Sequence, residues 1–181
     1  MGTHSIVATY GGDSGNAGSV SSTLSQAVTS VAPPAALVNA GFEIPALKGG
    51  YQYNPSAAGI GWTFSANSGI AGNGSAFGAA TAPDGVQVGF VQGASTISQT
   101  LSLNAGSYTL SFKASARWAQ PQPLRVMVDG VQIGALVAPT STAWTLFTIP
   151  FSVATSGTHA LAFVGTQAVD KTMFIDTVMI Q

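Results

Sequence analysis

The sequence contains no cysteine and very little charge. Its 181 residues include five Lys and Arg and six Asp and Glu, so 6% of the chain is charged and the formal net charge is −1; a typical domain is about one quarter charged. Without cysteine the chain can form no disulfide, no thiolate metal site and no cysteine nucleophile. Five scattered basic side chains cannot neutralise a row of phosphates, which excludes nucleic acid as a partner.

Long apolar runs are missing as well. No run approaches the roughly 18 residues that span a bilayer, and the N-terminal residues lack the basic and apolar regions of a signal peptide. We therefore expect no membrane insertion, and a chain that is a mature or excised piece of a longer protein. Because Ser, Thr, Asn, Gln and Gly must cover the surface in place of charge, the composition favours an extracellular or cell-surface location.

The sequence does contain many short alternating runs of β-branched and aromatic residues. Its hydrophobic fraction is 46%, which excludes a disordered chain. Gly, Asn, Asp and Pro separate the runs at intervals of about 8 to 12 residues, a spacing typical of all-β proteins. This pattern predicts a two-sheet antiparallel β-sandwich with strands at Val86–Val88, Ile97–Leu103, Tyr108–Trp118, Leu124–Val128, Val131–Ile133, Trp144–Val153, His159–Val164 and Met173–Ile180. Asp129 and Gly130 tolerate positive φ and predict a tight hairpin between two of them.

Residues 1–30 differ from the rest of the chain in their sequence pattern. Two alternating runs, His4–Tyr10 and Ser22–Val28, flank a polar loop, which predicts an N-terminal β-hairpin extension. Gly2 to Tyr10, Gly12-Asp13 and Ser21 to Val28 resemble the last two strands of a bacterial immunoglobulin-like repeat. Residues 31–35 contain two consecutive prolines and predict a stiff linker before a domain at 36–181.

The sequence allows more than one role for the isolated hairpin. A lone two-stranded hairpin is marginal in water, and its unpaired edges invite another strand. Residues 1–34 either join copies of the chain into a homo-oligomer or fibre by strand donation, or fold back on the sandwich. The alternative is a remnant of a neighbouring repeat with no role in assembly.

The order of motifs in residues 36–181 resembles a known superfold. The motifs are Leu37 to Glu43, Gly61 to Phe64, Pro83 to Val88, Ile97 to Leu101, Ala105 to Phe112 and Phe174 to Val178. They resemble the galactose-binding-like jelly roll of carbohydrate-binding modules appended to bacterial glycoside hydrolases. The resemblance implies a jelly roll and a polysaccharide or surface glycan as partner, although this superfold hosts several functions.

Sugar binding generally requires an exposed aromatic ring that stacks on the apolar face of a pyranose. Tyr51 and Tyr53 lie in a Gly-rich stretch and share parity, so an extended loop would present both rings on one side. Trp118 ends its predicted strand and either binds sugar or caps the sandwich. Trp62 and Trp144 occupy motif positions of the fold, and we expect them in the core.

Hydrogen bonds to sugar hydroxyls would come from arginine and glutamine. Alternation places Tyr108 and Leu110 on the core face of their strand and Arg117 on the opposite face. The same rule places Arg125 on the polar face of the next strand, so the two arginines could share one surface, with Gln120 near in sequence. Alternatively, each arginine only satisfies loop carbonyls.

The acidic residues suggest a metal rather than catalysis. In the jelly-roll modules that this sequence resembles, the acid after Gly-Phe and the Asp of the final strand often hold a structural calcium ion; Glu43 and Asp176 match those places. Alternatively, Glu43 is a hydrogen-bonded residue near the N-terminal strand and Asp176 stabilises a turn. Asp84, in Pro83-Asp84-Gly85, is expected to stabilise a turn.

No catalytic arrangement is recognisable in the sequence. The carboxylates fall in fold motifs, turns and loops, and the chain has neither a Gly-x-Ser-x-Gly elbow nor a phosphate-binding loop. We therefore expect no enzyme, but a non-catalytic extracellular carbohydrate-binding or adhesive module that uses aromatic stacking and Arg/Gln hydrogen bonds. The alternative is a structural subunit of an extracellular assembly, polymerising through residues 1–34.

Overall fold

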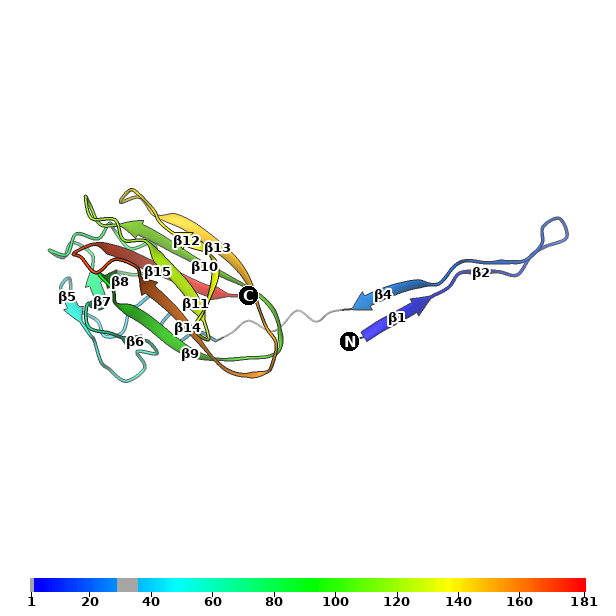
Figure 1. The fold of residues 1–181 in the computed structure, drawn as a ribbon, viewed down its shortest axis with the longest axis horizontal. Helices are drawn as coiled ribbons and strands as arrows, with labels where there is room; N and C mark the ends of the chain where they lie inside the picture. The colour runs from blue at the N-terminus through cyan, green and yellow to red at the C-terminus, as the bar shows by residue number, and fades with distance from the viewer. Residues whose placement is uncertain (1, 29–35) are drawn as a thin grey trace. The chain divides into compact units, whose positions relative to one another are not determined.

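The computed structural model describes residues 2–28 and 36–181. The chain separates into two compact units, Met1–Val31 and Ala32–Gln181 (Figure 1). The predicted linker at 31–35 lies outside the described residues. No helix among the described residues is long and apolar enough to cross a membrane.

The first unit is a hairpin made of two short ladders. Strand β1 (Gly2–Ile6) pairs antiparallel with β4 (Leu24–Val28), and β2 (Thr9–Tyr10) pairs with β3 (Ser19–Val20). The turn between them is held by Asp13, whose carboxylate accepts hydrogen bonds from the Tyr10 hydroxyl at 2.6 Å and from the amides of Gly15 and Asn16. Apart from Gly12, every residue from 2 to 27 is exposed, so the hairpin has no core of its own.

The second unit is a sandwich of two antiparallel sheets. The six-stranded sheet has the order β13-β10-β15-β8-β7-β5, and the five-stranded sheet has the order β12-β11-β14-β9-β6. The strands are β5 (Tyr51–Tyr53), β6 (Thr63–Phe64), β7 (Ser68–Gly72), β8 (Gln87–Gln92), β9 (Thr96–Leu103), β10 (Gly106–Ala116), β11 (Leu124–Val128), β12 (Val131–Val137), β13 (Thr145–Val153), β14 (Gly157–Gly165) and β15 (Thr172–Ile180).

The main core fills the space between the two sheets. Alternating side chains of β10 and β11 point inward, among them Leu110, Phe112 and Val126, each fully buried. Trp62 stacks on Phe42 with ring centroids 5.0 Å apart, and its indole N–H donates to the carbonyl of Asn39 at 2.8 Å. Burying a large apolar side chain typically stabilises a fold by about 1.5 to 3 kcal/mol relative to exposure.

A second, smaller apolar cluster covers the outer face of the six-stranded sheet. It contains the buried residues Ala71, Phe77, Val88, Phe90 and Phe174. Phe77 comes from the loop between β7 and β8, so this loop folds over the sheet and hides the outward-facing rings beneath it. The six-stranded sheet is consequently packed on both faces where β7, β8 and β15 lie.

The structure confirms the all-β antiparallel sandwich and the predicted strands, with ends that shift by a few residues. Asp129 and Gly130 have φ of 50° and 78° and form the predicted tight turn. Trp62 is in the core, whereas Trp144 is only partly buried, lies against the outer cluster and donates to the carbonyl of Thr81. Strands β5, β6 and β7 were not predicted, because β5 and β6 have only three and two residues and β7 contains two glycines.

Candidate functional site

Tyr51 and Tyr53 lie on the edge strand β5, not in a loop as the sequence suggested. Strand β5 pairs with β7 through Tyr51 opposite Ala71 and Tyr53 opposite Gly69. Both rings are on one side of the strand, as predicted, with centroids 6.0 Å apart in an edge-to-face arrangement. They remain 46% and 38% exposed, which leaves apolar ring surface available for contact with a ligand.

Gly69 allows β5 to sit this close to the sheet. A Cβ at Gly69 would overlap the carbonyl oxygen of Gln52 and would lie 2.7 Å from Cζ of Phe90. Because Gly69 has no side chain, the Gln52 carbonyl of β5 occupies that space, and the Tyr53 ring meets Phe90 edge-on with centroids 5.2 Å apart. The position of the tyrosine pair therefore depends on a residue that has no side chain.

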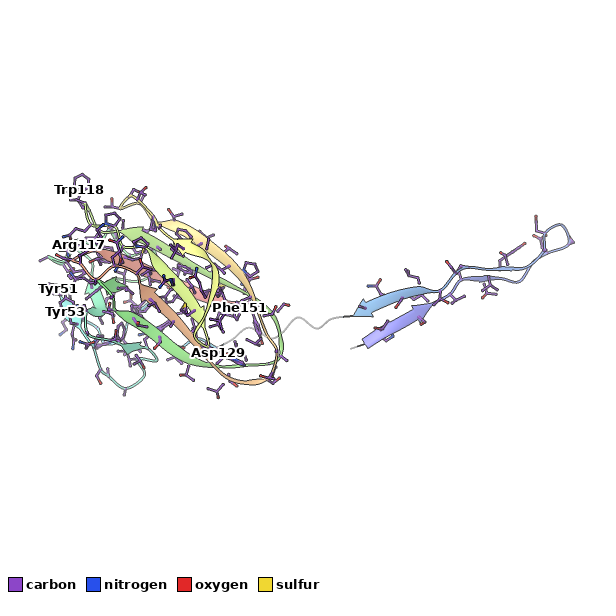
Figure 2. All side chains as sticks on the ribbon, in the orientation of Figure 1. Tyr51, Tyr53, Arg117, Trp118, Asp129 and Phe151 are labelled. Carbon is purple, nitrogen blue, oxygen red and sulfur yellow. The ribbon has the colours of Figure 1, made fainter. Side chains whose placement is uncertain are left out.

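Arg117 joins the tyrosine pair through Phe77. The Phe77 ring lies 5.1 Å from Tyr51 and 5.9 Å from Tyr53, and the guanidinium carbon of Arg117 lies 4.7 Å from the Phe77 centroid. A guanidinium at this distance from an aromatic ring is held by a cation–π interaction. The buried phenylalanine thus fixes the arginine beside the exposed tyrosines, and Figure 2 shows Arg117, Tyr51 and Tyr53 at one end of the sandwich.

Asp170 contacts several polar side chains of this surface. Its carboxylate lies 3.6 Å from Nη1 of Arg117 and accepts hydrogen bonds from Nε2 of Gln92 and, at 3.2 Å, of Gln120. The Tyr53 hydroxyl donates to Oε1 of Gln92 at 2.6 Å. Partial burial raises the pKa of Tyr53 above its ordinary value of 10.0, so this hydroxyl keeps its proton at neutral pH. The Asp170 side chain nevertheless remains exposed, so its carboxylate can still accept a hydrogen bond from a ligand.

Trp118 stands next to Arg117 and is 80% exposed, so it does not cap the sandwich. It follows the end of β10 and is followed by Ala119, whose φ of 56° turns the chain sharply. Trp118, Arg117 and the segment 140–142 line a hollow of about 340 Å³. Asp170, Gln92 and Asn67 line a second hollow of about 510 Å³.

Arg125 does not belong to this surface. The prediction that Arg117 and Arg125 share a face of adjacent strands is wrong, because β10 belongs to the six-stranded sheet and β11 to the five-stranded sheet. Arg125 is exposed and lies opposite Val164 of β14. The chain crosses from one sheet to the other between the two arginines, a step that strand alternation cannot reveal.

Five of the six predicted sugar-binding residues come together: Tyr51, Tyr53, Arg117, Trp118 and Gln120. Sequence reasoning missed Phe77, Gln92 and Asp170, which connect them. Gln92 has the same parity as Phe90 on β8, and alternation along that strand could have identified it. Phe77 and Asp170 occupy loops, where no periodic signal exists.

The predicted calcium ligands lie close to each other. Oε1 of Glu43 accepts hydrogen bonds from the amides of Val86 at 2.9 Å and Gln87 at 2.8 Å. The Asp176 carboxylate accepts from the amides of Asp84 at 3.1 Å and Thr177 at 2.7 Å. A Cβ built at Gly41 would lie within 4 Å of side-chain atoms of Glu43, Asp84 and Asp176. Asp84, predicted as a turn residue, is thus a neighbour of both predicted ligands.

The chemistry of these carboxylates fits a hard cation. Asp176 is fully buried, and burial, with smaller contributions from Asp84 and Glu43, raises its pKa from 3.8 to about 7. A bound cation would favour the charged form of this carboxyl group. Over residues 2–28 and 36–181, no three His, Asp or Glu side chains converge as a metal-binding group, so backbone carbonyls and water would have to complete the six to eight oxygens that calcium prefers.

No family model and no curated protein matches the sequence. Solved structures do resemble the fold. The Stig cyclase Fisc from Fischerella sp. TAU is 18% identical with a TM-score of 0.59, and the match covers 83% of this chain and 97% of the cyclase. The xylan-binding module CBM22-1 of Xyn10C from Paenibacillus barcinonensis is 17% identical with a TM-score of 0.54, covering 72% of this chain and 90% of the module.

A third similar structure is the module TmCBM61 in complex with β-1,4-galactotriose. It is 19% identical with a TM-score of 0.54, and the match covers 79% of this chain and 94% of the module. The second unit therefore has the jelly-roll β-sandwich fold of carbohydrate-binding modules, as its motifs predicted. The same fold also carries cyclases, so the fold alone leaves open whether the chain catalyses a reaction.

Proposed function

We propose that the chain is a non-catalytic carbohydrate-binding module and that its binding surface is the group Tyr51, Tyr53, Arg117, Trp118 and Gln120. The observation that carries the proposal is the pair of half-exposed tyrosine rings fixed beside a network of amide, carboxylate and guanidinium groups. Rings of this kind can stack on sugar C–H groups while the polar network binds the hydroxyls.

The comparisons support a polysaccharide as the ligand, because two similar structures are a xylan-binding module and a module in complex with β-1,4-galactotriose. The similarity to a cyclase favours the alternative of an enzyme. Asp176, whose pKa is raised to about 7, is a candidate proton donor by pKa alone. However, it is fully buried and its carboxylate is occupied by backbone amides, which favours a structural role.

Affinity electrophoresis in gels containing xylan or β-1,4-galactan tests the binding surface. We expect the intact chain to be retarded in at least one gel and the Tyr51→Ala/Tyr53→Ala variant to migrate freely, since its stacking surface is lost. Val131→Ala is the matched control, because Val131 is 68% exposed and follows the turn at Asp129, well away from the tyrosines in Figure 2. Equal retardation of the double variant and the wild type would contradict the proposal.

We also propose that Glu43 and Asp176 hold a structural calcium ion. Thermal unfolding at pH 8, above the raised pKa of Asp176, should show a higher Tm in calcium chloride than in EDTA, because a bound ion stabilises only the folded state. In Asp176→Asn the difference should shrink, since the variant loses one carboxylate ligand. A wild-type Tm that does not respond to calcium would refute the site.

A second candidate function is assembly through residues 1–34. Specific support comes from the hairpin, where Ile6 and Leu24 are directly opposite each other and are 51% and 59% exposed. The only acidic side chain of residues 2–28, Asp13, lies at the turn, so no carboxylate on β1 or β4 opposes edge-to-edge pairing.

Light scattering on the full chain distinguishes assembly from a remnant. If the hairpin joins copies, the wild type should form defined oligomers or fibres, and Ile6→Ser/Leu24→Ser should be monomeric, because the apolar cross-strand pair is removed. A monomeric wild type would show that the hairpin does not drive assembly.

We further propose an extracellular or cell-surface location. The composition and the proposed polysaccharide ligand support it, and fractionation of the native host tests it.

A further inference from the structure

A single ion pair joins the linings of the two hollows at the candidate site. Arg117 lines the first hollow and Asp170 lines the second, and their side chains approach to 3.6 Å. The pair therefore connects the linings of two open depressions of about 340 and 510 Å³ in the candidate binding surface. A ligand confined to one hollow would leave half of this surface unused.

Each hollow carries its own groups for binding a sugar unit. The first combines the exposed indole of Trp118 with the hydroxyl side chains of residues 140–142. The second presents the amides of Asn67 and Gln92 together with the carboxylate of Asp170. An aromatic face with hydroxyls on one side and amides with a carboxylate on the other are both typical of groups that bind polyols.

We propose that the site binds the interior of an uncharged polysaccharide chain, laid across the Arg117–Asp170 pair with sugar units in both hollows. This inference rests on the proposed carbohydrate-binding function and specifies its ligand. The tyrosine pair extends the same surface, because Phe77 contacts Tyr51, Tyr53 and Arg117 together. A chain end or a free monosaccharide would contact only part of it.

The charges of Arg117 and Asp170 select against acidic sugars. Arg117 is already engaged, by the Asp170 carboxylate on one side and by the face of Phe77 on the other. A uronate would have to displace Asp170 from Arg117 and would meet the 63% exposed carboxylate of Asp170 at short range. Like charges in close contact oppose binding, whereas neutral hydroxyls can donate to that same carboxylate.

Titration calorimetry on the full chain tests the inference. The probes are xylan, β-1,4-galactan and polygalacturonate, followed by the neutral oligosaccharides of the bound polymer from one to six units. We expect the affinity of the hexasaccharide to exceed that of the monosaccharide by about tenfold or more, since contacts in the second hollow are added. Polygalacturonate should bind at least about tenfold more weakly than the preferred neutral polymer.

Variants in the two hollows sharpen the test. Trp118→Ala and Asn67→Ala each remove part of one hollow, and in both we expect the gain in affinity with chain length to be reduced. Val131→Ala should behave as the wild type. Equal affinities for monosaccharide and hexasaccharide, or tighter binding of polygalacturonate, would overturn the inference while leaving carbohydrate binding intact. No binding of any polysaccharide by the folded chain would overturn the proposed function itself.

Discussion

At the scale of single residues, His159 lies between two hydrogen-bond acceptors that favour its charged form. Nδ1 lies 2.6 Å from Oδ2 of Asp129 and Nε2 lies 3.0 Å from the carbonyl of Thr155. Both partners accept, so both ring nitrogens must carry protons for both bonds to form. Accordingly, the hydrogen bond to Asp129 raises the pKa of His159 above 6.5, and the same bond lowers the pKa of Asp129 below 3.8.

The pair predicts a stability that depends on pH. The contribution of His159 is complete below pH 6.5 and is lost as pH rises through its raised pKa, whereas that of Asp129 is complete above pH 3.8 and is lost as pH falls through its lowered pKa. We expect the free energy of unfolding in urea to decline from pH 6 to 9 in the wild type. The decline should be smaller in Asp129→Asn, whose side chain also tolerates the positive φ. Identical pH profiles for the two proteins would contradict the prediction.

At the scale of elements, Gly69 and strand β5 support the binding surface. In Gly69→Ala the new methyl group would overlap the Gln52 carbonyl, so β5 should be displaced and the tyrosine pair lost from its position. We expect weaker retardation in the polysaccharide gel, with only a modest loss of stability, since β5 is a short edge strand. A suitable control is Gly11→Ala, because a Cβ at Gly11 would lie in open space. Unchanged retardation of Gly69→Ala would show that β5 does not position the ligand.

A second element, the loop that carries Phe77, can be tested through the cluster beneath it. Phe90→Ala removes a fully buried ring that contacts Phe77 at 4.1 Å and Tyr53 at 5.2 Å. Replacing a buried phenylalanine by alanine typically costs about 3 to 5 kcal/mol. Chemical denaturation should therefore show a loss in this range, accompanied by weaker polysaccharide binding. A loss below about 1 kcal/mol would mean that the outer cluster contributes little.

The elements also show what the sequence could and could not predict. The long strand β10 alternates between apolar and polar residues, and its predicted inward face is correct. The predicted ends of β10 and β14 are correct to within a few residues. Strand β5 has only Tyr51 to Tyr53, too few for alternation to separate it from a loop. The connections between Arg117, Asp170 and Phe77 join residues far apart in sequence, so they follow from tertiary packing and not from any local pattern.

At the scale of the whole molecule, the two units depend on different sources of stability. The described core is drawn entirely from residues 37 to 180, whereas the hairpin buries none of its side chains from 2 to 27. We predict that Ile6→Ser/Leu24→Ser leaves the Tm of the sandwich and its polysaccharide affinity unchanged. Scanning calorimetry would check the first point and gel retardation the second. A lower Tm in this variant would mean that the sandwich relies on the hairpin.

The three tryptophans of the sandwich experience unequal surroundings. The indole of Trp62 is buried and hydrogen-bonded, that of Trp144 is partly buried and hydrogen-bonded, and that of Trp118 is 80% exposed. Fluorescence emission from Trp118 alone should therefore respond strongly when a ligand displaces water from its ring. A shift of the emission to shorter wavelength that is absent in Trp118→Ala would report occupancy of the first hollow. The chain therefore carries its own optical probe at the place where the ligand is expected, and no attached dye is needed.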